Sequence, residues 1–175
     1  MFQKRAGDIM ISVSEYPHVR HTDTIRHAVE VMEHAHLEVA RRRSLPRALL
    51  VFDDEDHALG IVRRRDIFRG LEPKFLKTVS VPRRKQLIEI EIDPELFDLS
   101  TDRVGKAIQE QAELPVSEIM QPFAATVDYD DHLSNVIYKM LSRNLSLIPV
   151  VKEKRVVGVV RTVDVFQEVA ALLTK

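Results

Sequence analysis

Apolar residues recur along this chain in two distinct spacings. The segments TIRHAVEVM (24–32) and HLSNVIYKM (132–140) both place apolar residues at i, i+3, i+4 and i+7. This spacing predicts one face of an amphipathic helix. Continuous apolar runs of strand length follow each segment, first ALLVF (48–52) and ALGIV (58–62), then SLIPVV (146–151) and VVGVV (156–160). The polar stretches DDED (53–56) and KEKR (152–155) predict turns between paired strands.

A seven-residue phrase ends each series and occurs twice. It reads GIVRRRD at 60–66 and GVVRTVD at 158–164, and an apolar pair follows each aspartate. Further upstream, GDIM (7–10) matches SEIM (117–120). A short helix is predicted after each phrase, with the aspartate in its first turn, where a negative charge suits the helix dipole. The ordered duplication predicts two copies of one strand–helix–strand–strand–helix unit.

These duplicated blocks resemble a pair of CBS domains, which together form a Bateman module. The similarity covers residues 4–71 and 114–174, and the second copy, with its IPVV run, is nearer to the family pattern. The resemblance implies an α/β (α+β) fold in which two repeats pack with pseudo-two-fold symmetry. We therefore expect repeat 1 at 1–71, a largely helical insert at 72–113 and repeat 2 at 114–175.

The resemblance also implies a binding site for an adenosine ligand between the repeats. In the family, the aspartate of the repeated phrase accepts hydrogen bonds from the ribose hydroxyls, which suits an acceptor-only carboxylate. Asp66 and Asp164 occupy that position, and the alternative is that each only caps or charge-balances a helix start. The family usually has a small hydroxyl residue where this chain has Arg63 and Arg161. These arginines could grip phosphate, fill the pocket or point into solvent.

The segment that enters the first strand of each repeat is expected to form the wall against the purine. In repeat 2 it is PFAATV (122–127), whose small alanines admit a flat ring. In repeat 1 it is SEYPHV (14–19), in which Tyr16 and His18 either stack on adenine or simply pack. The site of repeat 2 is therefore predicted to bind better than that of repeat 1. The candidate nucleotide-binding residues are Asp164, Arg161, Thr126, Ala125, Pro149, Asp66, Arg63 and His18.

Two segments depart from a minimal pair of repeats. The apolar stripe of the first helix continues past Met32, which predicts a helix over 23–43, some three turns longer than its counterpart in repeat 2. The insert contains DRVGKAIQEQAE (102–113), which predicts a helix docked on the module. It also contains LIEIEI (87–92), which alternates like a half-buried strand.

The amino-acid composition mainly excludes classes of chemistry and of partner. The chain has no cysteine and a net charge of −1, so thiolate chemistry is ruled out and no global field attracts nucleic acid or an anionic membrane. Aromatic residues make up only 6%, which is poor for base stacking, so nucleic acid is an unlikely partner. Five histidines lie within residues 18–36 without an HExxH pattern, which favours a solvated helix face over a metal site.

No apolar run reaches the ~20 residues of a membrane span, and the N-terminal segment lacks an apolar signal region. A cytoplasmic location without membrane contact is therefore expected. The sequence contains no nucleophile elbow, Walker loop or dinucleotide fingerprint, and we expect neither enzyme activity nor a cofactor.

The resemblance implies a stand-alone regulatory, energy-sensing module that binds AMP, ADP or ATP and signals to an effector protein. The alternative is a protein-interaction module whose sites are blocked by arginine and which binds no nucleotide. CBS pairs usually dimerise through their outward helix faces, so a homodimer is expected. The apolar residues assigned to those faces are Val31, Ile67, Phe68, Val165 and Phe166.

Overall fold

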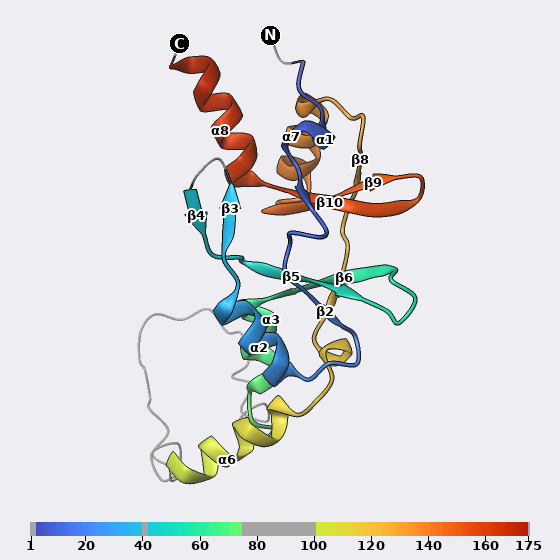
Figure 1. The fold of residues 1–175 in the computed structure, drawn as a ribbon. Helices are drawn as coiled ribbons and strands as arrows, with labels where there is room; N and C mark the ends of the chain where they lie inside the picture. Colours follow the sequence, from blue (N-terminus) through green and yellow to red (C-terminus); the bar gives the residue numbers. More distant parts are fainter. Residues whose placement is uncertain (1–2, 40–41, 75–100, 175) are drawn as a thin grey trace, which may run out of the picture.

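Two four-stranded sheets form the middle of the molecule, and helices cover the outer face of each sheet (Figure 1). The computed structural model describes residues 3–39, 42–74 and 101–174. The two sheets are built alike, each with three strands from one repeat and one strand from the other. This arrangement confirms the expected α/β fold of two related repeats.

Repeat 1 follows the predicted order of elements. Strand β2 (His18–Arg20) leads into helix α2 (Ile25–His34), and strands β5 (Ala48–Phe52) and β6 (Ala58–Arg63) lead into helix α3 (Arg64–Leu71). Strand β2 is parallel to β5, and β5 is antiparallel to β6. The Thr24 hydroxyl accepts a hydrogen bond from the His27 backbone N–H at 3.1 Å, which caps the start of α2.

Repeat 2 contains the same series. Strand β8 (Val127–Asp128) precedes helix α7 (Leu133–Ser142), and strands β9 (Leu147–Lys152) and β10 (Arg155–Arg161) precede helix α8 (Thr162–Leu173). The predicted apolar stripes point inward in both repeats. The buried residues of the two equivalent helices are Ile25, Ala28 and Met32 in α2 and Leu133, Val136 and Met140 in α7.

The two repeats exchange their first strands. Helix α1 (Ala6–Ile9) and strand β1 (Ile11–Ser12) come from repeat 1, but β1 pairs with β10 of repeat 2. The 3₁₀ turn η1 (Val116–Glu118) and strand β7 (Gln121–Pro122) come from repeat 2, but β7 pairs with β6 of repeat 1. The chain between β1 and β2, and that between β7 and β8, must therefore cross from one sheet to the other.

Three apolar clusters hold these layers together. One cluster lies between the sheet of repeat 2 and its helices, and it includes Ala6 and Ile9 of the exchanged helix α1. A second lies between the sheet of repeat 1 and helices α2 and α3, and it includes Val116 and Ile119 from η1 and the residue after it. The third joins strands of both sheets, and its buried residues are Ile11, Tyr16, Leu37, Leu50, Phe52 and Val159. The exchange therefore contributes side chains to the core of the opposite repeat, which couples the folding of the two halves.

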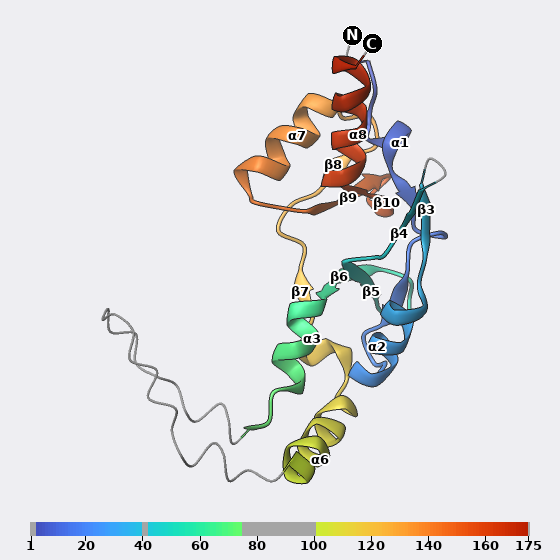
Figure 2. The same cartoon turned by 90° about the vertical axis from the view of Figure 1, so that its left-hand side faces the viewer.

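The predicted long helix over 23–43 is wrong. Helix α2 ends at His34, and its length equals that of α7, at 10 residues each. A hairpin follows instead, formed by β3 (Leu37–Val39) and β4 (Arg42–Ser44). Leu37 is 3% exposed and packs in the cluster between the sheets, so burial in this tertiary contact overrides the helical spacing. Figures 1 and 2 show the hairpin rising from α2 to the level of the sheet of repeat 2.

The described part of the insert is helical, as predicted. Helix α6 (Thr101–Ala112) packs against α3 and α2 at one end of the molecule (Figure 2). The Arg26 guanidinium, on α2, forms an ion pair with Glu113 at 2.6 Å. The predicted strand LIEIEI (87–92) lies outside the described residues.

Two residues assigned to the outward helix faces lie in the core instead. Ile67 and Val165 are 5% and 8% exposed, whereas Phe68 and Phe166 are 71% and 70% exposed. In each apolar pair after the aspartate, the first residue is therefore buried and the second is exposed, because adjacent residues of a helix point in directions about 100° apart. Within the described residues, no helix combines the length and apolar character that crossing a bilayer requires.

Candidate functional site

The glycine of each repeated phrase makes room for an exchanged strand. Gly60 pairs with Pro122 of β7, and a Cβ atom there would lie 2.2 Å from the Gln121 carbonyl oxygen. Gly158 pairs with Ser12 of β1, and a Cβ atom there would lie 2.6 Å from the Ile11 carbonyl oxygen. Neither glycine has a positive φ angle, so close approach of backbone, and not conformational freedom, accounts for both.

The arginine and aspartate of each phrase form an ion pair at a helix start. The Asp66 carboxylate accepts hydrogen bonds from the Arg63 backbone N–H at 3.0 Å, from Nε at 2.8 Å and from Nη2 at 3.1 Å. Asp164 accepts the equivalent three from Arg161, at 3.0, 2.9 and 2.6 Å. Both aspartates therefore cap and charge-balance their helices, α3 and α8. Their role toward ribose stays a prediction.

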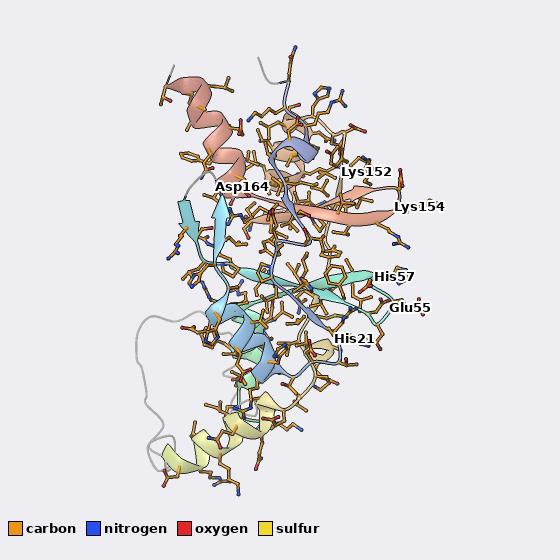
Figure 3. The ribbon with its side chains drawn as sticks, in the orientation of Figure 1. His21, Glu55, His57, Lys152, Lys154 and Asp164 are labelled. Atoms are coloured by element: carbon orange, nitrogen blue, oxygen red, sulfur yellow. The ribbon has the colours of Figure 1, made fainter. Side chains whose placement is uncertain are left out.

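The two ion pairs differ in their exposure to solvent. The Arg63 side chain is 40% exposed, although its Asp66 partner is 1% exposed. At the other pair, Arg161 and Asp164 are 10% and 3% exposed. The Arg161 Nη1 also donates a hydrogen bond to the Ser44 hydroxyl of the hairpin at 2.8 Å. Figure 3 places Asp164 at the base of α8, beside β3 and β4.

Tyr16, which belongs to repeat 1, lies between the two sheets and interacts electrostatically with Asp164 of repeat 2. Its side chain is buried, and its hydroxyl donates a hydrogen bond to the Ala48 carbonyl at 2.9 Å. Burial raises the pKa of Tyr16 well above its ordinary value, Arg161 lowers this pKa and Asp164 raises it further. The phenol therefore lies within electrostatic reach of both charges. We call the group of Tyr16, Ser44, Arg161 and Asp164 the Asp164 position.

The remaining candidate residues are spread over different environments. Thr126 is exposed, and its carbonyl accepts a hydrogen bond from Lys139 Nζ at 3.0 Å. Ala125 packs on the core of repeat 2, and Pro149 is buried in β9 opposite Val159. His18 is exposed, with its ring edge against Phe52 at 5.5 Å between centroids. The role of these four residues toward a nucleotide stays a prediction.

Sequence reasoning missed Ser44 and the electrostatic interaction of Tyr16 with Asp164. Ser44 lies 117 positions from Arg161, directly after the segment 23–43 whose spacing predicts a helix. The sequence assigns Tyr16 to the aspartate of its own repeat, because nothing in the linear pattern shows that the first strands are exchanged. The duplication does not reveal this exchange, since symmetric repeats can pack with or without it.

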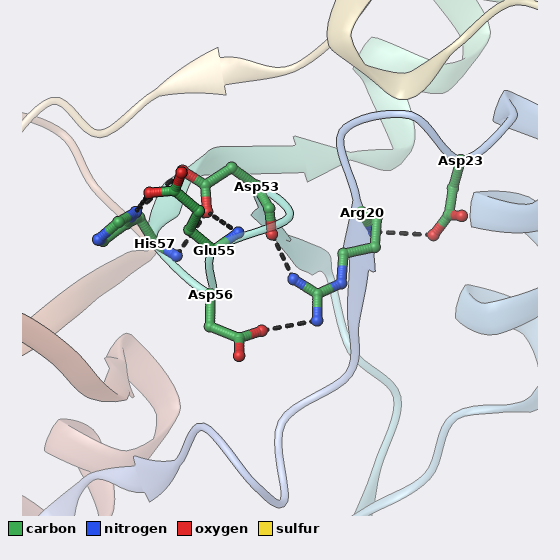
Figure 4. A network of polar contacts seen from close by, with 6 residues as sticks. All are labelled: Arg20, Asp23, Asp53, Glu55, Asp56 and His57. Atoms are coloured by element: carbon green, nitrogen blue, oxygen red, sulfur yellow. Dashed lines mark hydrogen bonds and ion pairs between the residues drawn. The ribbon is translucent and has the colours of Figure 1, made fainter.

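A second group of polar side chains surrounds the turn between β5 and β6 (Figure 4). The Arg20 guanidinium donates hydrogen bonds to the Asp53 carbonyl and to the Asp56 carboxylate. The Asp53 carboxylate accepts from the backbone N–H groups of His57 and Glu55. The His57 backbone hydrogen bond is the main cause that lowers the Asp53 pKa below its ordinary value. Each group has a partner within the turn, so the network orders the hairpin and ties β2 to it.

The described histidines of repeat 1 include His18 on strand β2 and His27 and His34 on helix α2. Among the residues described by the structure, no three histidine, aspartate or glutamate side chains are grouped as metal ligands would be. His34 contacts the Glu30 carbonyl oxygen on its own helix at 2.8 Å.

Comparison with known proteins identifies the family and the fold. The family model for the CBS domain matches residues 6–73 and 116–171. No curated protein matches the sequence. A CBS domain of a membrane protein from Sphaerobacter thermophilus superposes with a TM-score of 0.65 at 22% identity, over 95% of this chain and 88% of that chain.

Two further solved structures of similar fold contain nucleotides. CBSX2 in complex with AMP has a TM-score of 0.62 at 18% identity, over 98% of each chain. The cytosolic domain of the Mg2+ channel MgtE in complex with ATP has a TM-score of 0.60 at 20% identity, over 95% of this chain and 49% of that chain. At these identities the similarity establishes the fold alone.

Proposed function

Because this chain belongs to the CBS-domain family, we propose that it is a cytoplasmic, energy-sensing regulatory module that binds one adenosine nucleotide at Asp66 and signals to an effector protein. It is a regulator and not an enzyme in this proposal. The nucleotides in the structures of CBSX2 and MgtE support AMP, ADP or ATP as the ligand class. The choice of Asp66 reverses the order expected from the sequence, and its support is the exchange of the first strands.

The choice of Asp66 depends on which of the two segments entering β2 and β8 lies near which aspartate. Val19 pairs with Val51, and Val127 pairs with Val150, so these two valines are equivalent. Tyr16 stands three residues before Val19, and the exposed Ala124 stands three residues before Val127. Tyr16 lies within electrostatic reach of Asp164 of the opposite repeat, so we expect its equivalent Ala124 to lie near Asp66. We define the Asp66 position as Arg63, Asp66 and Ala124.

The charges around Asp66 suit a phosphate group. Arg63, Arg64 and Arg65 surround the start of α3; Arg64 and Arg65 are exposed, and Arg63 is half-exposed. The partly positive N-terminus of the helix adds to their field. The corresponding residues after Arg161 are Thr162 and Val163, which carry no charge. An arginine can hold two phosphate oxygens at once, so this position favours a nucleotide over an uncharged nucleoside.

Ala124→Tyr should abolish or weaken nucleotide binding at least tenfold, or by about 1.4 kcal/mol, because a phenol ring would occupy the purine wall as Tyr16 does at Asp164. Calorimetric titration of AMP, ADP and ATP measures the change, with Ala124→Ser as the matched control. Equal affinity in the wild type and both variants would reject Asp66 as the site. If the wild type binds none of these nucleotides, the alternative of an interaction module without nucleotide is correct.

We also propose that the chain forms a homodimer through its exposed helix faces. Four large side chains on α3, α7 and α8 are 69–76% exposed, namely Phe68, Tyr138, Leu141 and Phe166. Such an apolar surface is commonly covered by a partner.

Phe166→Glu should convert the dimer into a monomer of 20.1 kDa at micromolar concentration, because a charge at the centre of an apolar contact opposes burial. Light scattering after gel filtration measures the mass. Leu45→Glu, at an exposed apolar residue before β5, is the control and should remain dimeric. A monomeric wild type would exclude the proposed dimer.

A further inference from the structure

We infer that two copies of this chain associate through helices α7 and α8 of repeat 2 alone, which leaves the helix face of repeat 1 outside the contact. This inference rests on the proposed homodimer and narrows it, because that proposal uses exposed helix faces of both repeats. The surface that receives the second copy is the outer face of α7 and α8. We call it the α7–α8 face and define it by its large exposed apolar residues, which are Tyr138, Leu141, Val163, Phe166 and Leu173.

Each of these two helices carries an exposed apolar stripe on the side away from the core. Tyr138 and Leu141 are three residues apart on α7. On α8, Val163, Phe166 and Leu173 are spaced by three and seven residues, so they lie along one side of the helix. The five side chains are between 44% and 80% exposed. Helices α7 and α8 lie side by side on the sheet of repeat 2, so both stripes belong to the same outer surface (Figures 1 and 2).

The charged residues of α7 and α8 already have partners within the chain. These two helices contain three of them, and each forms an ion pair. The pairs are Lys139–Asp131 at 3.5 Å, Asp164–Arg161 at 2.6 Å and Glu168–Lys4 at 2.8 Å. A second copy can therefore cover the α7–α8 face without burying a charge that lacks a partner, which would be strongly destabilising.

The equivalent surface of repeat 1 is charged. When α2 and α7 are aligned on their buried stripes, the exposed Glu30 and Glu33 of α2 take the places of the two apolar residues of α7. On α3, Phe68 corresponds to Phe166, but the exposed Arg64 and Arg65 lie four and three residues before it. Residues at these spacings are neighbours on the surface of a helix.

These charges disfavour any contact that uses the helix face of repeat 1. Two copies of this face would place like charges opposite each other, which is costly at an interface. A contact between repeat 1 and repeat 2 would instead bury Glu30 and Glu33 against apolar side chains. Helix α6 also takes up part of this surface, because it packs against α3 and α2 and is followed by the ion pair of Glu113 with Arg26. The contact of one α7–α8 face with another has neither cost.

Phe166→Glu and Phe68→Glu form a matched pair that tests the inference, since the two phenylalanines are equivalent and are 70% and 71% exposed. We expect Phe166→Glu to raise the dimer dissociation constant at least about 30-fold, as for a residue at the centre of a contact, and Phe68→Glu to leave it unchanged. Sedimentation equilibrium measures both constants. Equal weakening by the two substitutions would overturn the inference and leave the proposed homodimer standing, whereas a monomeric wild type would contradict both.

Spin labels give a second test that leaves the α7–α8 face unchanged. The chain has no cysteine, so a single label can be attached through Ser142→Cys on α7 or through His34→Cys at the equivalent position of α2. Both residues are exposed. In the dimer, electron–electron resonance should give a shorter distance between two labels at position 142 than between two labels at position 34. Equal distances, or a shorter distance at position 34, would overturn the inference.

Discussion

Asp164→Ala should lower the free energy of unfolding by about 3–5 kcal/mol, the cost of removing one partner of a buried ion pair. The substitution leaves the Arg161 guanidinium buried, with the Ser44 hydroxyl as its only side-chain partner among the residues that the structure describes. It also removes the cap of α8, because the carboxylate accepts the Arg161 backbone N–H. The sequence places Asp164 near the surface, which would make the change harmless to folding. That expectation is wrong, because the residue is 4% exposed.

Asp66→Ala is the matched comparison, since it removes the same hydrogen bonds from an equivalent helix start. Its cost should be smaller, about 1–2 kcal/mol, because the half-exposed Arg63 side chain can turn into solvent when its partner is lost. Urea denaturation of both variants measures the difference. A loss from Asp164→Ala no larger than that from Asp66→Ala would show that the buried guanidinium finds another partner.

Gly60→Ala should destabilise the protein by about 3 kcal/mol, at the upper end of the usual cost of overpacking. The added Cβ atom would meet the Gln121 carbonyl oxygen at 2.2 Å. This oxygen is backbone in the exchanged strand β7, so it cannot move aside as a side chain would. We expect the variant to lose the pairing of β6 with β7, and with it part of the packing of η1 in the core of repeat 1.

Gly105→Ala is the control for this prediction. Gly105 lies within α6, and a Cβ atom there meets nothing within 4 Å. Alanine should therefore stabilise the helix by about 0.4–1 kcal/mol, since it reduces the entropy of the unfolded chain. The two substitutions have identical chemistry and opposite expected signs, and thermal unfolding measures both. A stabilising Gly60→Ala would contradict the close approach of the two strands.

The secondary structure of each repeat could be predicted because its determinants are local. Apolar stripes at helical spacing, such as Ile25, Ala28 and Met32, became the buried faces of helices. Polar stretches between apolar runs became turns, and Asp66 and Asp164 became caps within the first turn of a helix. The helix predicted over 23–43 is wrong beyond His34, because it was inferred from local spacing alone. Its spacing continued, but Leu37 gains more from burial between the sheets than from staying in a helix.

Only the residue types of the candidate site could be predicted from the sequence, and not their contacts. The repeated arginine and aspartate were found from the sequence, but their pairing with each other could not be separated from a role toward phosphate. Only the tertiary structure shows that the Arg161 guanidinium binds Asp164 and also donates a hydrogen bond to Ser44. Contacts of this kind depend on residues 117 positions apart, and no periodicity in a sequence records them.

The amino-acid sequence is enough to predict two similar α/β units with a helical insert, because duplication and local hydrophobic spacing are properties of the linear chain. The exchange of the first strands between the units is visible only in the tertiary structure. Two similar sheets can bury their apolar faces with either connectivity, so hydrophobic patterning does not distinguish them. The distinction lies in the close approach of backbone at Gly60 and Gly158, which is set only when the two repeats pack together.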